Sequence, residues 1–92
     1  MTNRTPNDPY ALALGALTAT LSDERCARRF LDMTGIETDE LRAQVGDPAL
    51  LSALIAFLEA HEPDLVAVSE ELGVSPEVLV QARRELEGEE RR

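Results

Sequence analysis

Residues 8–12 read Asp-Pro-Tyr-Ala-Leu, and residues 47–51 read Asp-Pro-Ala-Leu-Leu. A second pair follows at nearly the same offset, because Gly-Ile at 35–36 recurs as Gly-Val at 73–74. Asp-Pro is typical of a helix start, since Asp caps the N–H groups of the first turn and Pro lacks an N–H where none is needed. Gly followed by an aliphatic residue is typical of a helix end. The two pairs therefore predict an internal repeat, with each copy holding a helix opened by Asp-Pro, a helix closed by Gly and a short third helix.

We therefore expect an all-α fold, a single small bundle of about six short helices in two pseudo-repeated three-helix units. The helical domain should span residues 8–87, with a flexible N-terminal lead-in at 1–7 and a frayed C-terminal tail at 88–92. A chain of 92 residues has room for one thin core and not for a deep substrate cavity. We expect the first and fourth helices at the centre of the bundle.

Large apolar side chains recur at helical spacing in the first predicted helix. This predicts one apolar stripe, formed by Tyr10, Leu14, Leu17 and Leu21. Small residues line a neighbouring stripe, and a Gly inside a helix favours close contact with another helix. We expect the surface of Ala11 and Gly15 to pack against Leu54 and Leu58 of the fourth helix.

Polar residues mark the starts of the remaining helices. Ser22 and Thr38 are predicted N-caps, because each precedes a first turn rich in acidic residues. Glu62-Pro63 should start the fifth helix and Ser75-Pro76 the sixth.

The charge of the chain argues against several classes of partner. Its formal net charge is −9, from 18 acidic and 9 basic residues, and every basic side chain is Arg. Such a charge repels nucleic-acid phosphates and anionic membranes. The N-terminal residues lack the apolar run of a signal peptide, and no window reaches the roughly 18 apolar residues of a membrane helix. We expect a cytoplasmic protein without a membrane partner.

One segment keeps an alternative function open. Residues 69–86 have the order of a helix-turn-helix, with a Gly-centred turn between two helices. The second helix offers Gln81, Arg83 and Arg84 as contacts to DNA, but acidic residues surround them. The alternative is thus a DNA-binding regulator that uses this segment, although the charge disfavours nucleic acid as a partner.

The sequence shows no constellation that predicts an enzyme. Cys26 lies in the first turn of a helix near Arg25 and Arg29, which favours a reactive thiol, but a small buried apolar role is the better interpretation. His61 lacks an identifiable orienting group. The acidic clusters do not have the spacing of a calcium-binding loop. We expect no catalytic residues, no cofactor and no metal site.

The remaining candidate is a surface for another protein. Arg25, Arg28 and Arg29 form a basic patch on an otherwise acidic chain, and Phe57 lies in a helix that is apolar over most of its circumference. Guanidinium groups bind carboxylates well, and exposed apolar surface marks contact sites. We expect a non-enzymatic interaction or regulatory module that binds an unidentified protein or forms a homodimer.

Three stretches carry a resemblance to a known family: residues 11–17 (ALALGAL), 29–36 (RFLDMTGI) and 47–51 (DPALL). From about Pro9 to Leu86 the chain resembles DUF3572, a family of small helical proteins found mainly in alphaproteobacteria. The family name denotes a domain of unknown function, so the resemblance brings no catalytic residues. It implies a bacterial cytoplasmic setting, a stand-alone helical domain and no known enzymatic activity.

Overall fold

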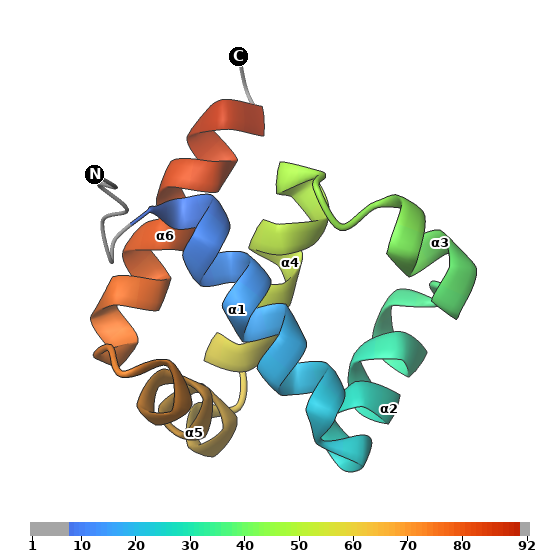
Figure 1. Cartoon of the computed structure of the whole chain (residues 1–92), viewed down its shortest axis with the longest axis horizontal. Coiled ribbons are helices and arrows are strands. Elements are labelled where there is room, and N and C mark those ends of the chain that lie inside the picture. The colour runs from blue at the N-terminus through green and yellow to red at the C-terminus, as the bar shows by residue number, and fades with distance from the viewer. Residues whose placement is uncertain (1–7, 91–92) are drawn as a thin grey trace, which may run out of the picture.

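A computed structural model describes residues 8–90 of the chain, and all of its regular structure there is helical (Figure 1). The expected all-α fold is confirmed. The helices are α1 (Pro9–Ser22), α2 (Glu24–Thr34), α3 (Thr38–Ala43), α4 (Pro48–Glu59), α5 (Glu62–Leu72) and α6 (Pro76–Glu90).

The helix ends that define the sequence repeat form as predicted. Asp8 and Asp47 each accept a hydrogen bond from the backbone N–H two residues later, at 3.2 and 3.0 Å, and a Pro opens each helix. Gly35 ends α2 at φ 71° and Gly73 ends α5 at φ 74°, both in the left-handed region. These are the only positive-φ residues in the part of the chain that the structure describes, and both are Gly because a Cβ is strained there.

Two predicted N-caps are wrong by one residue. Ser22 is the last residue of α1, where its hydroxyl donates to the backbone carbonyl four residues earlier at 2.9 Å. Asp23 takes the cap of α2 instead, accepting from the N–H groups of the first turn. Likewise Thr38 is the first residue of α3, and Glu37 caps that helix in a capping box with Glu40.

The repeat holds for the caps but not for the third helix of each half. α3 has 6 residues and α6 has 15. α6 packs on α4 and α1, whereas α3 has no extensive contact with another helix. Figure 1 shows α3 at the edge of the molecule, far from α5 and α6. The second half therefore provides most of the core, and α3 extends from it.

The core lies where α1 crosses α4 and where α6 packs against both helices (Figure 1). The predicted contact between α1 and α4 is confirmed, but the contact between α4 and α6 is the most extensive, so α6 shares the centre. Burying one such aliphatic or aromatic side chain stabilises the fold by about 1.5–3 kcal/mol. The largest fully buried apolar side chains are Phe30, Leu51, Leu54, Ile55, Leu58, Leu79 and Leu86.

The predicted apolar stripe of α1 enters the core only in part, since Leu17 is buried and Tyr10 half-buried. Leu14 and Leu21 are 40% and 37% exposed, and Ala11 is exposed as well. Gly15 approaches Leu72 of α5, since a Cβ there would lie 3.0 Å from Leu72 Cδ2. The face that enters the core consists of Leu12, Ala13, Ala16, Leu17, Ala19 and Thr20.

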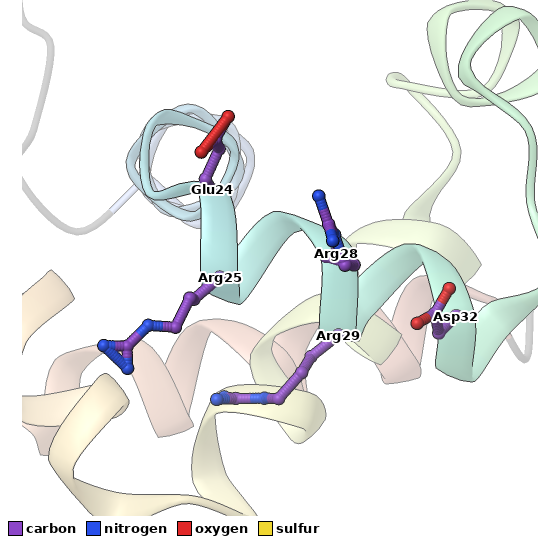
Figure 2. A pocket seen from close by; sticks show the side chains of 5 residues that line it. All are labelled: Glu24, Arg25, Arg28, Arg29 and Asp32. Atoms are coloured by element: carbon purple, nitrogen blue, oxygen red, sulfur yellow. The ribbon is translucent and has the colours of Figure 1, made fainter.

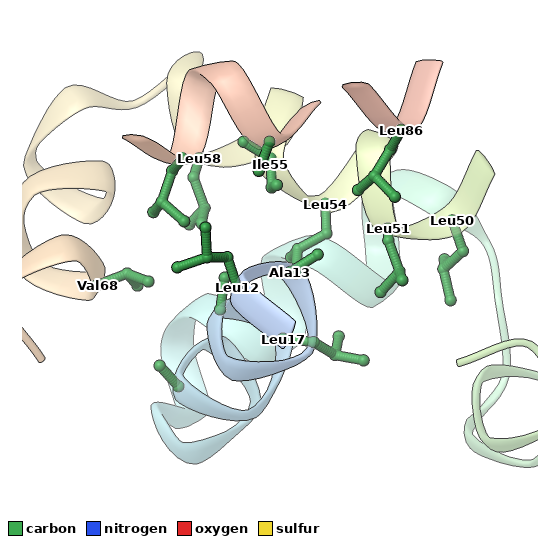
Figure 3. Close-up of a cluster of buried hydrophobic side chains, with 14 of the residues drawn as sticks. Leu12, Ala13, Leu17, Leu50, Leu51, Leu54, Ile55, Leu58, Val68 and Leu86 are labelled. Atoms are coloured by element: carbon green, nitrogen blue, oxygen red, sulfur yellow. The ribbon is translucent and has the colours of Figure 1, made fainter. Parts of the chain in front are cut away.

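Close approach of the backbones explains this choice of face. Figure 3 shows Leu12 and Ala13 on the side of α1 that faces α4, toward Leu54 and Leu58. Ala13 is fully buried, and because its side chain is small, the axes of α1 and α4 can lie near each other. Apolar residues surround α1 on all sides, so their periodicity did not identify the buried face.

The sixth helix extends beyond the expected domain boundary at residue 87, because α6 runs to Glu90. Gly88 does not have a positive φ and therefore does not stop the helix. The predicted lead-in at residues 1–7 and the end of the predicted tail at 91–92 lie outside the described residues.

Candidate functional site

The predicted basic patch lies along the exposed side of α2. Arg25, Arg28 and Arg29 line a shallow depression of about 360 Å³ together with Glu24 and Asp32 (Figure 2). We call these five residues the α2 patch. All five are exposed, so a partner can reach the patch from solvent.

Helical spacing sorts the α2 patch into two rows. Arg25 and Arg29 are four residues apart and extend to the same side of the helix (Figure 2). Glu24, Arg28 and Asp32 form the other row, again at intervals of four. The patch is therefore not a uniformly positive surface, because carboxylates lie before and after Arg28.

Arg29 is already bound within the protein. Its guanidinium donates to the Asp64 carboxylate of α5 and lies over the ring of Phe57, 5.5 Å from the centroid. The hydrogen bond to Asp64 raises the pKa of Arg29 above its ordinary value. Phe57 also meets Phe30 edge to face, with ring centroids 5.3 Å apart. Arg29 and Phe57, both predicted to bind a partner, thus hold α2 against α4 and α5.

Arg25 and Arg28 have no such internal role. Neither forms an ion pair with any residue in the range 8–88, whose side chains the structure describes. Each guanidinium can bind a carboxylate or a phosphate with two parallel hydrogen bonds. These two residues are the part of the predicted site that remains available to a ligand.

Cys26 lies on α2 beside Arg29 of the α2 patch and is 5% exposed. Burial raises the pKa of its thiol, and a hydrogen bond to Asp64 with the charge of that carboxylate raises it further. The nearby Arg29, whose Nη2 lies 4.0 Å from Sγ, lowers this pKa only in part. The protonated thiol is a poor nucleophile.

His61 also lies near Asp64, with Nε2 4.0 Å from Asp64 Oδ2. We call Cys26, His61 and Asp64 the Asp64 cluster. A catalytic thiol needs the imidazole between itself and the carboxylate, so that the imidazole takes its proton. Among the described side chains the Cys26 sulfur has a hydrogen bond with Arg29 and none with His61, so no imidazole lies between the thiol and Asp64. The cluster therefore holds a protonated thiol and does not activate it. The sequence alone does not reveal this cluster, because its members come from α2 and from the start of α5.

The segment predicted as a helix-turn-helix forms α5, the turn at Gly73 and α6. Arg83, one of its candidate DNA contacts, donates to Glu59 of α4 and to Glu87, at 3.2 and 3.0 Å for its two terminal nitrogens. The hydrogen bond to Glu59 raises the pKa of Arg83 above its ordinary value. Gln81 donates to Glu85 at 3.2 Å. Arg84 alone of the three candidates has neither a side-chain hydrogen bond nor an ion pair among the described side chains.

The described residues also bear on metal binding and on membrane insertion. None of their acidic, His and Cys side chains form a group of three or more that could hold a metal ion. None of the helices between residues 8 and 90 has the length and apolar character needed to span a bilayer.

Comparison with known proteins gives one match. Neither the curated proteins nor the solved structures contain a match to this chain. A family model described as "Protein of unknown function (DUF3572)" matches residues 6–89. That range covers nearly the whole chain and includes all of the helices except the last residue of α6, so the chain belongs to the DUF3572 family.

Proposed function

We propose that this protein is a non-enzymatic interaction module whose α2 patch binds a short acidic segment of another protein. One observation carries the proposal: Arg25 and Arg28 form no ion pair among the described side chains, although acidic residues outnumber basic ones two to one in the chain. By contrast, Arg29 and Arg83 each contact a neighbouring helix, and each is paired there with a carboxylate.

The spacing of these two residues restricts the partner. Side chains three residues apart on a helix have Cβ atoms about 5–6 Å apart. The best fit is a segment that presents two carboxylates at a similar distance, for example from one helical turn. Because the chain carries −9 overall, a long acidic partner is repelled, whereas a short one feels the nearby guanidinium groups within a Debye length of about 8 Å.

The chemistry of the Asp64 cluster supports the non-enzymatic part of the proposal. Cys26, the one thiol of the chain, is buried with a raised pKa, and His61 is not placed to deprotonate it. The depression beside it is shallow and lined by charged side chains, which differs from the apolar pockets that bind small substrates.

Affinity capture with matched variants tests the proposal. The tagged chain, the Arg25→Glu/Arg28→Glu double variant and the Arg84→Glu control are each incubated with nuclease-treated lysate of the native cell. Captured proteins are quantified by mass spectrometry. Arg84 is a matched control because it is also exposed and unpaired among the described side chains.

We expect one partner that the wild-type chain and Arg84→Glu retain and the double variant loses, with binding that weakens as salt rises. Equal capture by all three proteins would overturn the proposal. Capture of DNA from lysate without nuclease, lost in Arg84→Glu, would replace it with the DNA-binding alternative for residues 69–86.

A further inference from the structure

α3 is the one helix between residues 8 and 90 that has no extensive contact with another helix. It lies within residues 36–46, which connect the end of α2 to the Asp47 cap of α4, and Figure 1 shows it at the edge of the molecule. We call residues 36–46 the α3 strap.

Two apolar side chains attach the α3 strap to the core. Leu41 is 5% exposed and belongs to the buried cluster, and Ile36 is partly buried and packs against that cluster. Every other residue of the strap is exposed, including the apolar Val45. Beside Ile36, a shallow depression of about 440 Å³ is also lined by Leu31 of α2, so side chains do not fill the junction between α2 and α3. The attachment therefore depends chiefly on Leu41.

The hydrogen bonds of the α3 strap are local. Glu37 and Glu40 form the capping box of α3, and the Gln44 N–H donates to the Glu40 carbonyl at 3.1 Å. The Asp47 N–H donates to the Gln44 carbonyl at 2.9 Å, next to the strap in sequence. Among the described residues, no side-chain hydrogen bond or ion pair joins residues 37–46 to another helix. These bonds can therefore break without breaking any bond between the other helices.

We propose that the α3 strap opens as a unit while the other helices stay packed, and that the Leu41 side chain holds it closed. Segments with few buried apolar contacts open at a lower free energy than the whole domain. Gly35 at φ 71° and Gly46, which has open space at its Cβ position, flank the opening segment and suit the change of backbone angles. The domain then has two states, and a ligand that prefers one of them shifts the population. This inference does not depend on the α2 patch.

Hydrogen exchange at urea concentrations below the unfolding transition tests the inference. We expect the hydrogen-bonded amides of Leu41 and Gln44 to have protection factors at least about a hundredfold below those of the slowest amides in α4 and α6. Their exchange should also depend less on urea, because opening the strap exposes less surface than unfolding the domain. Equal protection and equal urea dependence in α3 and α4 would overturn the inference.

Two variants separate local opening from unfolding of the domain. Leu41→Ala should lower the protection of the strap and of α4 by the same factor, at least about tenfold, because the contacts of Leu41 are lost in both events. Ile55→Val, a milder change at a fully buried position of α4, should lower protection in α4 and α6 by about two- to tenfold and leave the strap unchanged. An equal loss of protection in the strap and in α4 of Ile55→Val would contradict local opening.

Limited proteolysis locates the opening segment. Every basic residue of the chain is Arg, and Arg42 is the one in the α3 strap, so trypsin reports on it directly. Because a protease cuts the opened form, we expect the first cut within residues 8–90 to follow Arg42. Arg42→Gln is the matched control and should be cut within that range at least about tenfold more slowly. A first cut of the wild-type chain after Arg25, Arg28 or Arg84 would place the least stable segment elsewhere and overturn the inference.

Discussion

Arg29 of α2 forms an ion pair with Asp64 of α5, and this pair links two helices that are far apart in the sequence. The guanidinium also lies over the Phe57 ring of α4, so one side chain contacts three helices. α2 has its extensive helix contact with α1 alone. The pair therefore supplies much of what fixes the orientation of the α2 patch.

Replacing Arg29 should loosen α2 without unfolding the domain. We expect the thermal midpoint to fall in the order wild type, Arg29→Lys, Arg29→Ala, because Lys keeps the charge but loses the planar group that stacks on Phe57. Circular dichroism gives the midpoints, and hydrogen exchange should show faster exchange in α2. Arg28→Ala, on the same helix without an ion pair among the described side chains, is the control and should leave both measurements unchanged.

The two left-handed Gly residues give a second prediction. Gly35→Ala should destabilise the fold by about 1–2 kcal/mol, because an L-residue at φ 71° is strained although a Cβ would meet nothing within 4 Å. Gly46→Ala is a matched control, since Gly46 also has open space but no positive φ. Urea unfolding measures both variants, and equal stability of the two would contradict the conformational explanation.

These Gly residues also illustrate what the sequence could reveal about the fold. The caps at Asp8 and Asp47 and the ends at Gly35 and Gly73 depend on neighbouring residues, so short patterns predict them. The buried side of α1 depends on how closely α1 and α4 approach, and a helix that is apolar all round does not show that in its periodicity.

The candidate site was predictable to a similar extent. Arg25, Arg28 and Arg29 lie within one helix, so their common exposed side follows from helical spacing. The partner of Arg29 is 35 residues away in the sequence, at a position that is one of several equivalent acidic residues. Only the packing of α5 beside α2 identifies Asp64, which is why Arg29 and Phe57 looked available to a partner.

The two ion pairs of Arg83, with Glu59 and with Glu87, give a third prediction. Glu59→Gln should cost about 1–2 kcal/mol of stability, because it weakens the ion pair that links α4 to α6. The Arg83 side chain in this pair is only 20% exposed. Glu87→Gln should cost less than about 0.5 kcal/mol, since it removes a pair within one helix. Urea unfolding of Glu59→Gln, Glu87→Gln, Arg83→Gln and the two double variants that combine Arg83→Gln with each Glu change gives the coupling energies. Equal costs for the two Glu changes would contradict a cross-helix role.

The buried thiol gives the last prediction. Unfolded Cys26 ionises near pH 8.5, whereas burial raises the pKa of the folded thiol above its ordinary value. Above about pH 8.5 the unfolded chain has therefore lost a proton that the folded chain retains, so the Cys26 contribution to stability falls as pH rises toward the folded-state pKa. Unfolding measured from pH 7 to 10 should show a steeper loss for wild type than for Cys26→Ala. Iodoacetamide should also modify folded wild type much more slowly than the urea-unfolded chain at pH 8, whereas fast modification of the folded protein would indicate an activated thiol and reopen an enzymatic role for Cys26.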